Sequence, residues 1–187
     1  MSSPRLLIEL PPWVDVFVDW RRRYASVEDR MAMVIDLGHE QVRRATGGPF
    51  AAAVFERESG ALIAVGVNLA VPSHNCALHA EVVALMMAGA RLHSHNLGAE
   101  GMAAHDLVSS CEPCAMCLGA TAWSGVTRLV TGATKADAES IGYDEGPVFP
   151  ESWAYLERRG IEILRGVRRQ EARTLFAEYQ AAGGVIY

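Results

Sequence analysis

Hydrophobic and polar residues alternate along the chain in blocks that predict a β-hairpin followed by alternating helices and strands. Ala51–Glu56 and Ala61–Leu69 are rich in Ala, Val and Ile, and Arg57–Gly60 separates them. Short apolar runs of this kind on either side of a turn that contains Gly are typical of a hairpin. Residues 71–77 show no regular pattern and predict a loop.

A helix is predicted before the hairpin, because Met31, Val34, Ile35 and Val42 recur at roughly helical spacing. A Ser at position 26 and an Asp at position 29 resemble a capping box at its start, and Gly47–Pro49 ends it. The preceding residues, 1–25, form an N-terminal extension with no predicted function. Its aromatic-rich part, residues 13–20, predicts a short helix.

Helical and strand patterns alternate after residue 78. The predicted segments are a helix at 79–91, a strand at 106–109, a helix at 114–123, a strand at 127–131, a helical turn at 135–140, a helix at 152–159, a strand at 161–164 and a helix at 168–182. A hairpin followed by this alternation predicts an α/β fold, a three-layer α/β/α sandwich on a mixed five-stranded sheet. The domain is expected to span residues 26–182, followed by a tail at 183–187.

The composition is that of a soluble globular protein, with 50% hydrophobic and 21% charged residues. No apolar run is long enough to span a bilayer, and Met1–Arg5 do not begin a secretory signal, so we expect a cytoplasmic protein. The net charge is −5, and no basic stripe of the kind that binds nucleic acid is visible. A small neutral substrate is therefore expected, with neither nucleic acid nor a membrane as partner.

Two short motifs carry the candidate chemistry, His79-Ala80-Glu81 and Pro113-Cys114-Ala115-Met116-Cys117. A catalytic zinc ion takes three protein ligands and leaves its fourth position to water. His79, Cys114 and Cys117 supply such a set, and the two Cys share one face at the start of a predicted helix. Zinc would lower the pKa of its water, and the neighbouring Glu81 carboxylate would move the protons.

A structural zinc site is the competing interpretation of the same cysteines. Cys111 could join Cys114 and Cys117, and His93, His95 or Cys76 could supply a further ligand. The protein would then be a non-catalytic binding module stabilised by zinc. This interpretation gives Glu81 and Pro113 no role.

The combined H-x-E and P-C-x-x-C pattern is the signature of the zinc-dependent nucleobase deaminases. The chain therefore resembles the cytidine deaminase-like superfamily over roughly residues 30–165. Ser110–Ala120 followed by Trp123, and Gly142–Glu145 further on, look like the bacterial guanine deaminases of this fold. The resemblance implies an enzyme of purine catabolism that hydrolyses guanine to xanthine and ammonia, with one catalytic Zn²⁺ per subunit.

The same resemblance implies roles for residues outside the two motifs. Phe50 would lie over the purine ring, Asn68 would hydrogen-bond the base edge, and Trp123 would form a wall of the pocket. Ala80 would also belong to the substrate site. Glu145 would be the second catalytic acid, which assists proton transfer at the amino group, with its neighbour at position 144 as the alternative.

The tail combines Gly183 and Gly184 with an apolar tip that ends at Tyr187. In the guanine deaminases, the C-terminal segment crosses to the partner subunit and covers its active site. The resemblance therefore implies a homodimer with a swapped C-terminal segment, in which Tyr187 closes the pocket of the neighbour.

Other deaminases remain alternatives at this stage. Aminotriazines such as ammeline present an edge similar to that of guanine, and cytosine or a tRNA adenosine are further candidate substrates. Free cytidine deaminases usually carry Cys where this chain has His79. The tRNA adenosine deaminases share both motifs, but they tend towards basic surfaces and usually carry His near Trp123.

Overall fold

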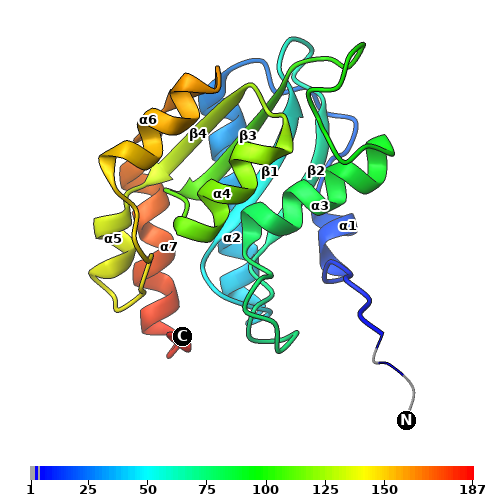
Figure 1. Ribbon diagram of the computed structural model, residues 1–187. Helices are drawn as coiled ribbons and strands as arrows, with labels where there is room; N and C mark the ends of the chain where they lie inside the picture. Colours follow the sequence, from blue (N-terminus) through cyan, green and yellow to red (C-terminus); the bar gives the residue numbers. More distant parts are fainter. Residues whose placement is uncertain (1–2, 4) are drawn as a thin grey trace.

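Residue 3 and residues 5–187 are described in a computed structural model, in which helices cover both faces of one five-stranded sheet (Figure 1). The strands are β1 (Ala51–Glu56), β2 (Leu62–Val67), β3 (His105–Cys111), β4 (Arg128–Ala133) and β5 (Glu162–Leu164). Their spatial order is β2-β1-β3-β4-β5. β1 runs antiparallel to β2 and β3, whereas β3, β4 and β5 are parallel. The predicted α/β/α sandwich on a mixed sheet is confirmed.

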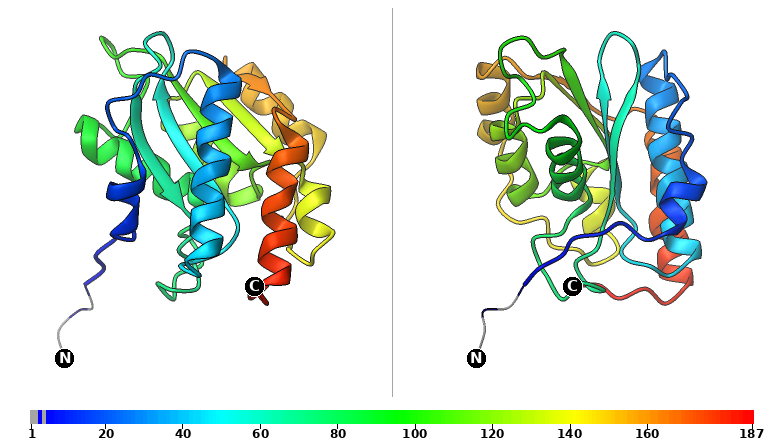
Figure 2. Two further views of the ribbon diagram at one scale, coloured as in Figure 1. Left: turned by 180° about the vertical axis from the view of Figure 1, so that it is seen from behind. Right: turned by 90° about the vertical axis from the view of Figure 1, so that its right-hand side faces the viewer.

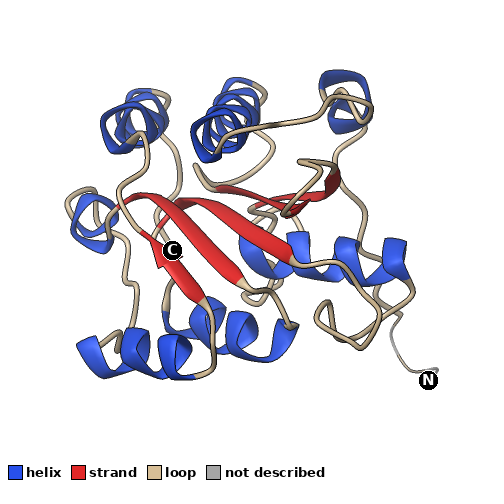
Figure 3. Ribbon diagram, turned by 90° about the horizontal axis from the view of Figure 1, so that it is seen from above, coloured by secondary structure: helices blue, strands red, loops and turns tan. Residues whose placement is uncertain are grey.

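The helices form two layers, one on each face of the sheet. They are α1 (Trp13–Phe17), α2 (Val27–Arg43), α3 (Ala80–Leu92), α4 (Ala115–Ser124), α5 (Lys135–Glu139), α6 (Pro150–Arg158) and α7 (Arg169–Ala181). Helices α2 and α7 lie side by side on one face, and α3, α4 and α6 cover the other (Figures 2 and 3). The short α1 packs on the α2 side, where its Val14 is fully buried.

The sheet separates two hydrophobic cores. Val34, Leu37 and Phe55 belong to the core beneath α2 and α7. Leu107, Leu129 and Leu156 belong to the core beneath α3, α4 and α6. All seven residues of the central strand β3 are buried, because helices cover both of its faces. This double burial extends β3 beyond the four residues that the sequence pattern predicted.

The N-terminal extension packs along the edge of this body. Val14 and Val18 are buried in the α2-side core, and Arg23 forms a single bridge to Ala61 at the start of the hairpin's second strand. Residues 1, 2 and 4, part of the segment over which no secretory signal is expected, lie outside the described residues. Within the described part of the chain, every helix is too short or too polar to cross a bilayer.

The fold brings the two sequence motifs together at the end of the sheet where the parallel strands terminate. β3 ends at Cys111, and α3 and α4 both begin next to this end (Figure 1). Gly66 in β2 permits the close approach of α3, because a Cβ there would lie 2.1 Å from the carbonyl oxygen of Ala80. The carboxyl ends of parallel strands are the usual place for a site in such a sheet.

Candidate active site

The three predicted metal ligands converge at the starts of two helices. His79 and Cys114 are the N-cap residues of α3 and α4, and Cys117 follows in the first turn of α4. Among the described residues, theirs is the one group of three or more His, Cys, Asp or Glu side chains whose ligand atoms lie within 4.8 Å of one another. The fold therefore assembles one compact N/S donor set from positions 35 residues apart.

This donor set fits zinc. The Nδ1 atom of His79 lies 3.4 Å from the Sγ atom of Cys114. A tetrahedral zinc site separates its nitrogen and sulfur ligands by about 3.5 Å, given Zn–S and Zn–N bonds of about 2.3 and 2.0 Å. The side chains therefore already lie at the spacing that the ion requires.

The cluster also favours thiolate chemistry. A hydrogen bond from the Cys117 thiol, followed by one from His79, lowers the pKa of Cys114 to about 4. The bond to Cys114 and burial raise the pKa of Cys117, and the bond to Cys114 raises the pKa of His79. One thiolate is thus present near neutral pH, and thiolates are the form that binds zinc.

Cys111 belongs to a different environment. Its buried thiol donates to the carbonyl oxygen of Thr134 at 3.5 Å, and burial raises its pKa well above the usual value. Cys76 is exposed in the loop before α3. The alternative structural zinc site needs the Cys111 thiol as a ligand. In the structure this thiol is hydrogen-bonded to Thr134 instead and does not belong to the three-residue cluster.

Glu81 lies beside the ligands, with only 6% of its surface exposed. The hydroxyl of Ser109, on β3, donates to its Oε1 atom at 3.1 Å. Burial, and then the negative charge of Cys114, raise the pKa of the Glu81 carboxyl. A carboxylate with a raised pKa is a better proton acceptor near neutral pH.

A small cavity of about 90 Å³ opens between the ligands and the C-terminal tail. It is lined by Phe50, Asn68, His79, Glu81, Glu112, Cys114, Tyr143, Asp144, Glu145 and Tyr187. The predicted residues Phe50, Asn68, Glu145 and Tyr187 are therefore brought together with His79, Glu81 and Cys114. Tyr143 was missed by the sequence reasoning, and its edge contact with Phe50, at 4.9 Å between ring centroids, closes one side.

Glu145 and Asp144 differ sharply in their surroundings. Glu145 is 7% exposed, and burial and the charge of Glu81 raise its pKa to about 8. Asp144 is exposed, and its Oδ1 atom accepts a hydrogen bond from the backbone N–H of Gly146 at 2.8 Å. The geometry thus gives Asp144 a role in the turn and leaves the buried carboxyl of Glu145 facing the cavity.

Two residues expected in the substrate site lie elsewhere. Trp123 is 75% exposed on α4 and borders a separate hollow beside α3, so in this chain it forms no wall of the cavity. Helical periodicity could not show which face of α4 its side chain takes. Ala80 is fully buried and does not line the cavity, and its backbone carbonyl oxygen lies against Gly66 of β2.

The tail covers the cavity of its own chain. The Tyr187 ring packs edge-on against Tyr143, at 5.5 Å between centroids, and lies 6.5 Å from the His79 ring. Tyr179 holds the tail by donating from its hydroxyl to the carbonyl oxygen of Val185 at 2.9 Å. The expected position of Tyr187 over an active site is present, but over the site of the same subunit.

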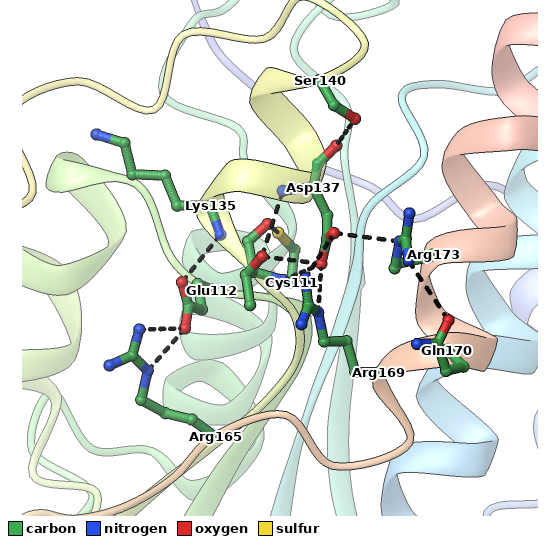
Figure 4. Close-up of polar contacts among 10 residues, drawn as sticks. Cys111, Glu112, Lys135, Asp137, Ser140, Arg165, Arg169, Gln170 and Arg173 are labelled. Atoms are coloured by element: carbon green, nitrogen blue, oxygen red, sulfur yellow. Dashed lines mark hydrogen bonds and ion pairs between the residues drawn. The ribbon is translucent and has the colours of Figure 1, made fainter.

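A polar cluster next to the ligands supports the loop that carries them (Figure 4). The buried Glu112 carboxylate accepts hydrogen bonds from the Lys135 backbone N–H at 2.9 Å and from Arg165 Nε at 2.7 Å. The Lys135 ammonium donates to the carbonyl oxygen of Gly146 at 2.7 Å. Lys135 thereby joins the loop before Cys114 to the loop of Glu145, a link between distant segments that no sequence signal pointed to.

A family model matches residues 25–133 of the chain. It describes the cytidine and deoxycytidylate deaminase zinc-binding region. The match covers both sequence motifs and the three candidate ligands.

Three relatives extend this similarity. The chain is 34% identical to a guanine deaminase of Bacillus subtilis over 74% of its own length and 84% of that protein. A solved structure of a guanine deaminase from Nitrosomonas europaea is 46% identical, with a TM-score of 0.91, and covers 97% of this chain and 99% of its own. Another solved structure, in complex with 2,6-diaminopurine, is 48% identical, with a TM-score of 0.91, and covers 97% and 95%.

Proposed function

Because this chain belongs to the cytidine and deoxycytidylate deaminase zinc-binding family, we propose that it is a zinc-dependent deaminase that hydrolyses guanine to xanthine and ammonia. The observation that carries this proposal is the cavity in which Asn68, Glu81 and Glu145 face the three-ligand cluster. The names of the relatives from B. subtilis and N. europaea support guanine as the substrate.

His79, Cys114 and Cys117 would hold one zinc ion per subunit. When bound, the ion lowers the pKa of a coordinated water towards neutrality and so supplies the nucleophile. Cys114 and Cys117 lie in the first turn at the N-terminus of α4, whose partial positive charge would favour their thiolate forms when the ion is bound.

Glu81 moves protons between the water and the base. Its Oε1 atom is fixed by Ser109, and the carboxylate takes a proton from the attacking water. The same proton passes to N3 of guanine as the water oxygen forms a bond to C2. When the C2–N bond breaks, the amino nitrogen takes one proton from Glu145 and the second water proton replaces it on that carboxyl, so that ammonia leaves and the 2-oxo group of xanthine remains.

Glu145 assists the departure of ammonia. Its raised pKa keeps the carboxyl largely protonated near neutral pH, so it can donate to the amino nitrogen as that nitrogen becomes basic. Phe50 and Tyr187 would hold the base ring between apolar surfaces. Asn68 would hydrogen-bond the base edge, because its amide offers both a donor and an acceptor.

The test is ammonia release by the zinc-loaded protein from guanine, adenine, cytosine, cytidine and an aminotriazine. We expect turnover of guanine and none of adenine or cytosine, and any turnover of the aminotriazine would measure how selectively the pocket reads the ring. Absence of ammonia release from guanine, in a protein shown to contain one zinc per chain, would refute the proposal.

The protein is proposed to act as a cytoplasmic homodimer in purine catabolism, with exchanged C-terminal tails. The exposed Trp123 and Met86 on α4 and α3 border an apolar hollow of about 520 Å³, which supports a second copy as the occupant of this face. Gly183 has a φ of +69°, which gives the tail a hinge at its root. The five-residue tail is joined to the domain through this hinge, which favours an exchange between two pockets.

A further inference from the structure

The N-terminal extension reaches the substrate cavity through a chain of hydrogen bonds. The indole N–H of Trp13, in α1, donates to Thr46 Oγ1 at 3.1 Å. The Thr46 hydroxyl donates to Gln41 Oε1 at 2.7 Å, and the Gln41 amide Nε2 donates to the backbone carbonyl oxygen of Asn68 at 2.8 Å. Three consecutive bonds therefore connect α1 to the predicted base-reading residue.

Along this series of hydrogen bonds, each group donates to the next in the direction from Trp13 to Asn68. The indole can only donate, so Thr46 must use its own hydroxyl proton towards Gln41. That bond occupies the carbonyl oxygen of the Gln41 amide and leaves its NH₂ group to donate to Asn68. Hydrogen bonds that run head to tail polarise one another and strengthen in a buried setting.

The Gln41–Asn68 end of this hydrogen-bond series is buried. Gln41 is 0% exposed and Asn68 is 1% exposed. Gly47 packs directly on their contact, because a Cβ there would lie 2.0 Å from the Asn68 carbonyl oxygen and 2.1 Å from Gln41 Nε2. Water cannot easily replace a lost protein partner at this place, so each bond fixes the position of the next group.

The remaining bonds of Asn68 fix its side chain as well. Its backbone N–H donates to the carbonyl oxygen of Phe50 at 3.1 Å. Its Oδ1 atom accepts from the backbone N–H of Ala70 at 3.1 Å. With the backbone carbonyl held by Gln41 and Oδ1 held by Ala70, the side-chain NH₂ group remains as the donor on the cavity side, where the Tyr187 side chain is its hydrogen-bond partner.

We propose that Trp13, Thr46 and Gln41 are positioning residues for base recognition, and that the extension thereby sets the affinity of the site through Asn68. Here the base is the nucleobase substrate of the proposed function, on which this inference rests. Trp13 and Thr46 do not line the catalytic cavity, so their effect is transmitted through Gln41 and Asn68.

Thr46→Val tests the hydrogen-bond series at its middle, because the substitution removes the hydroxyl and keeps the shape of the side chain. We expect KM for guanine to rise about three- to tenfold with kcat changed less than about twofold, since one buried hydrogen bond that acts on base binding is lost. Thr46→Ser restores the hydroxyl and should return KM to the wild-type value. Trp13→Phe, which keeps a ring but removes the indole N–H, should change KM in the same direction as Thr46→Val.

Trp20→Phe is the matched control. Trp20 lies in the same extension and packs against the Arg91 guanidinium, 4.3 Å from the ring centroid. In the part of the chain that the structure describes, its indole N–H has no recorded acceptor, so KM should stay at the wild-type value. The double variant Trp13→Phe, Thr46→Val should match Thr46→Val alone, because both changes interrupt one chain.

Amide hydrogen exchange provides a readout that needs no turnover. Thr46→Val should speed exchange of the Asn68 and Ala70 amide protons in the zinc-loaded protein, whereas Thr46→Ser and Trp20→Phe should not. Unchanged exchange and unchanged KM in Thr46→Val would overturn the inference, as would equal losses in the Val and Ser variants. Wild-type protein that releases no ammonia from guanine would refute the proposed function alone, while the exchange comparison would still decide the positioning.

Discussion

At the scale of single residues, the surroundings distinguish the acids proposed to perform proton chemistry from an acid that holds the structure. Glu81 and Glu145 are both nearly inaccessible, and burial, followed by neighbouring negative charge, raises the pKa of both carboxyls. Glu112 is equally buried, yet its carboxylate is engaged by Arg165 and by the backbone of Lys135. Glu112 therefore supports the loop before Cys114, whereas burial favours the protonated forms of Glu81 and Glu145.

Glu81→Gln should abolish turnover without loss of the metal. Gln has nearly the same shape as the protonated acid and can still accept the hydrogen bond of Ser109, but it cannot accept a proton. We expect kcat to fall by at least about a thousandfold, in the range expected for loss of a general base. Zinc content, measured on the same preparation, should remain at one ion per chain. Substantial turnover by a zinc-replete Glu81→Gln protein would contradict the mechanism.

Gly47→Ala should destabilise the fold and weaken base binding together. The added Cβ overlaps the Asn68 carbonyl oxygen and the Gln41 amide, and forced overpacking costs about 1–3 kcal/mol. Gly119→Ala is the control, because the nearest atoms to a Cβ in that helical position are 3.9 Å away. It should stabilise the protein by about 0.5–1 kcal/mol, as Ala replaces Gly in a helix. Urea unfolding of both variants measures the difference, and equal shifts would contradict the steric argument.

At the scale of the elements, α5 connects the end of β4 to the catalytic loop and is held by one acid. Asp137 accepts hydrogen bonds at its Oδ2 atom from the backbone N–H of Thr134 and from Arg169 Nε, both at 2.8 Å (Figure 4). The Arg169 guanidinium and the Thr134 N–H hold the pKa of Asp137 well below its usual range. Lys135, whose ammonium reaches the Glu145 loop, lies in the same short helix.

Asp137→Asn should therefore reduce stability in a manner that depends on pH. Asp137 has a lower pKa in the folded chain than in the unfolded chain, so its contribution is complete above the unfolded value of about 4. That contribution is lost as the pH falls from about 4 towards the lowered pKa. We expect Asp137→Asn to cost about 1–2 kcal/mol at pH 7 and progressively less below pH 4. Thermal unfolding across this range measures the difference, with Glu171→Gln on the exposed face of α7 as a control, and a constant difference at all pH values would exclude the ionic origin.

The sequence predicted every strand and helix, but the ends depended on tertiary contacts. β3 was predicted too short because burial on both faces removes the alternation that marks a strand. The spacing of His79, Cys114 and Cys117 predicted the three-residue cluster that the fold assembles, since a metal site restricts both residue type and separation. Ser109 and Tyr143 were not predicted, because a Ser in a strand or a Tyr in a loop carries no periodic signal. Trp123 is exposed on α4 and does not line the cavity of its own chain, so its expected place in a pocket wall stays a prediction.

At the scale of the whole molecule, the oligomeric state decides which cavity the C-terminal tail covers, that of its own chain or that of a second copy. Tyr187 closes the cavity of its own chain here, whereas an exchanged tail would close the cavity of a second copy. The two placements differ in the direction that the tail takes from Gly183, whose φ is +69°. The two placements predict different behaviour for hybrid dimers.

Mixing two inactive chains should restore activity if the tails are exchanged. One chain carries Glu81→Gln and an intact tail, and the other ends at Ala182 with an intact Glu81. In an exchanged dimer, the tail of the first chain covers the intact site of the second, so we expect up to about half the wild-type activity per hybrid dimer. A tail that stays on its own chain would leave the mixture as inactive as its components. The ammonia assay, together with light scattering to confirm the dimer, measures the outcome.

The placement of the ligands at positions 79 and 114–117 also affects how the unfolded chain behaves. An ion held by both segments ties a loop of some 36 residues and removes its freedom to open. Because the two segments come together only in the folded chain, binding of the ion favours the folded over the unfolded state. The metal would thus link the start of α3 to the start of α4 reversibly. A strong chelator should then lower the melting temperature as well as the rate, and resupplied zinc should raise both.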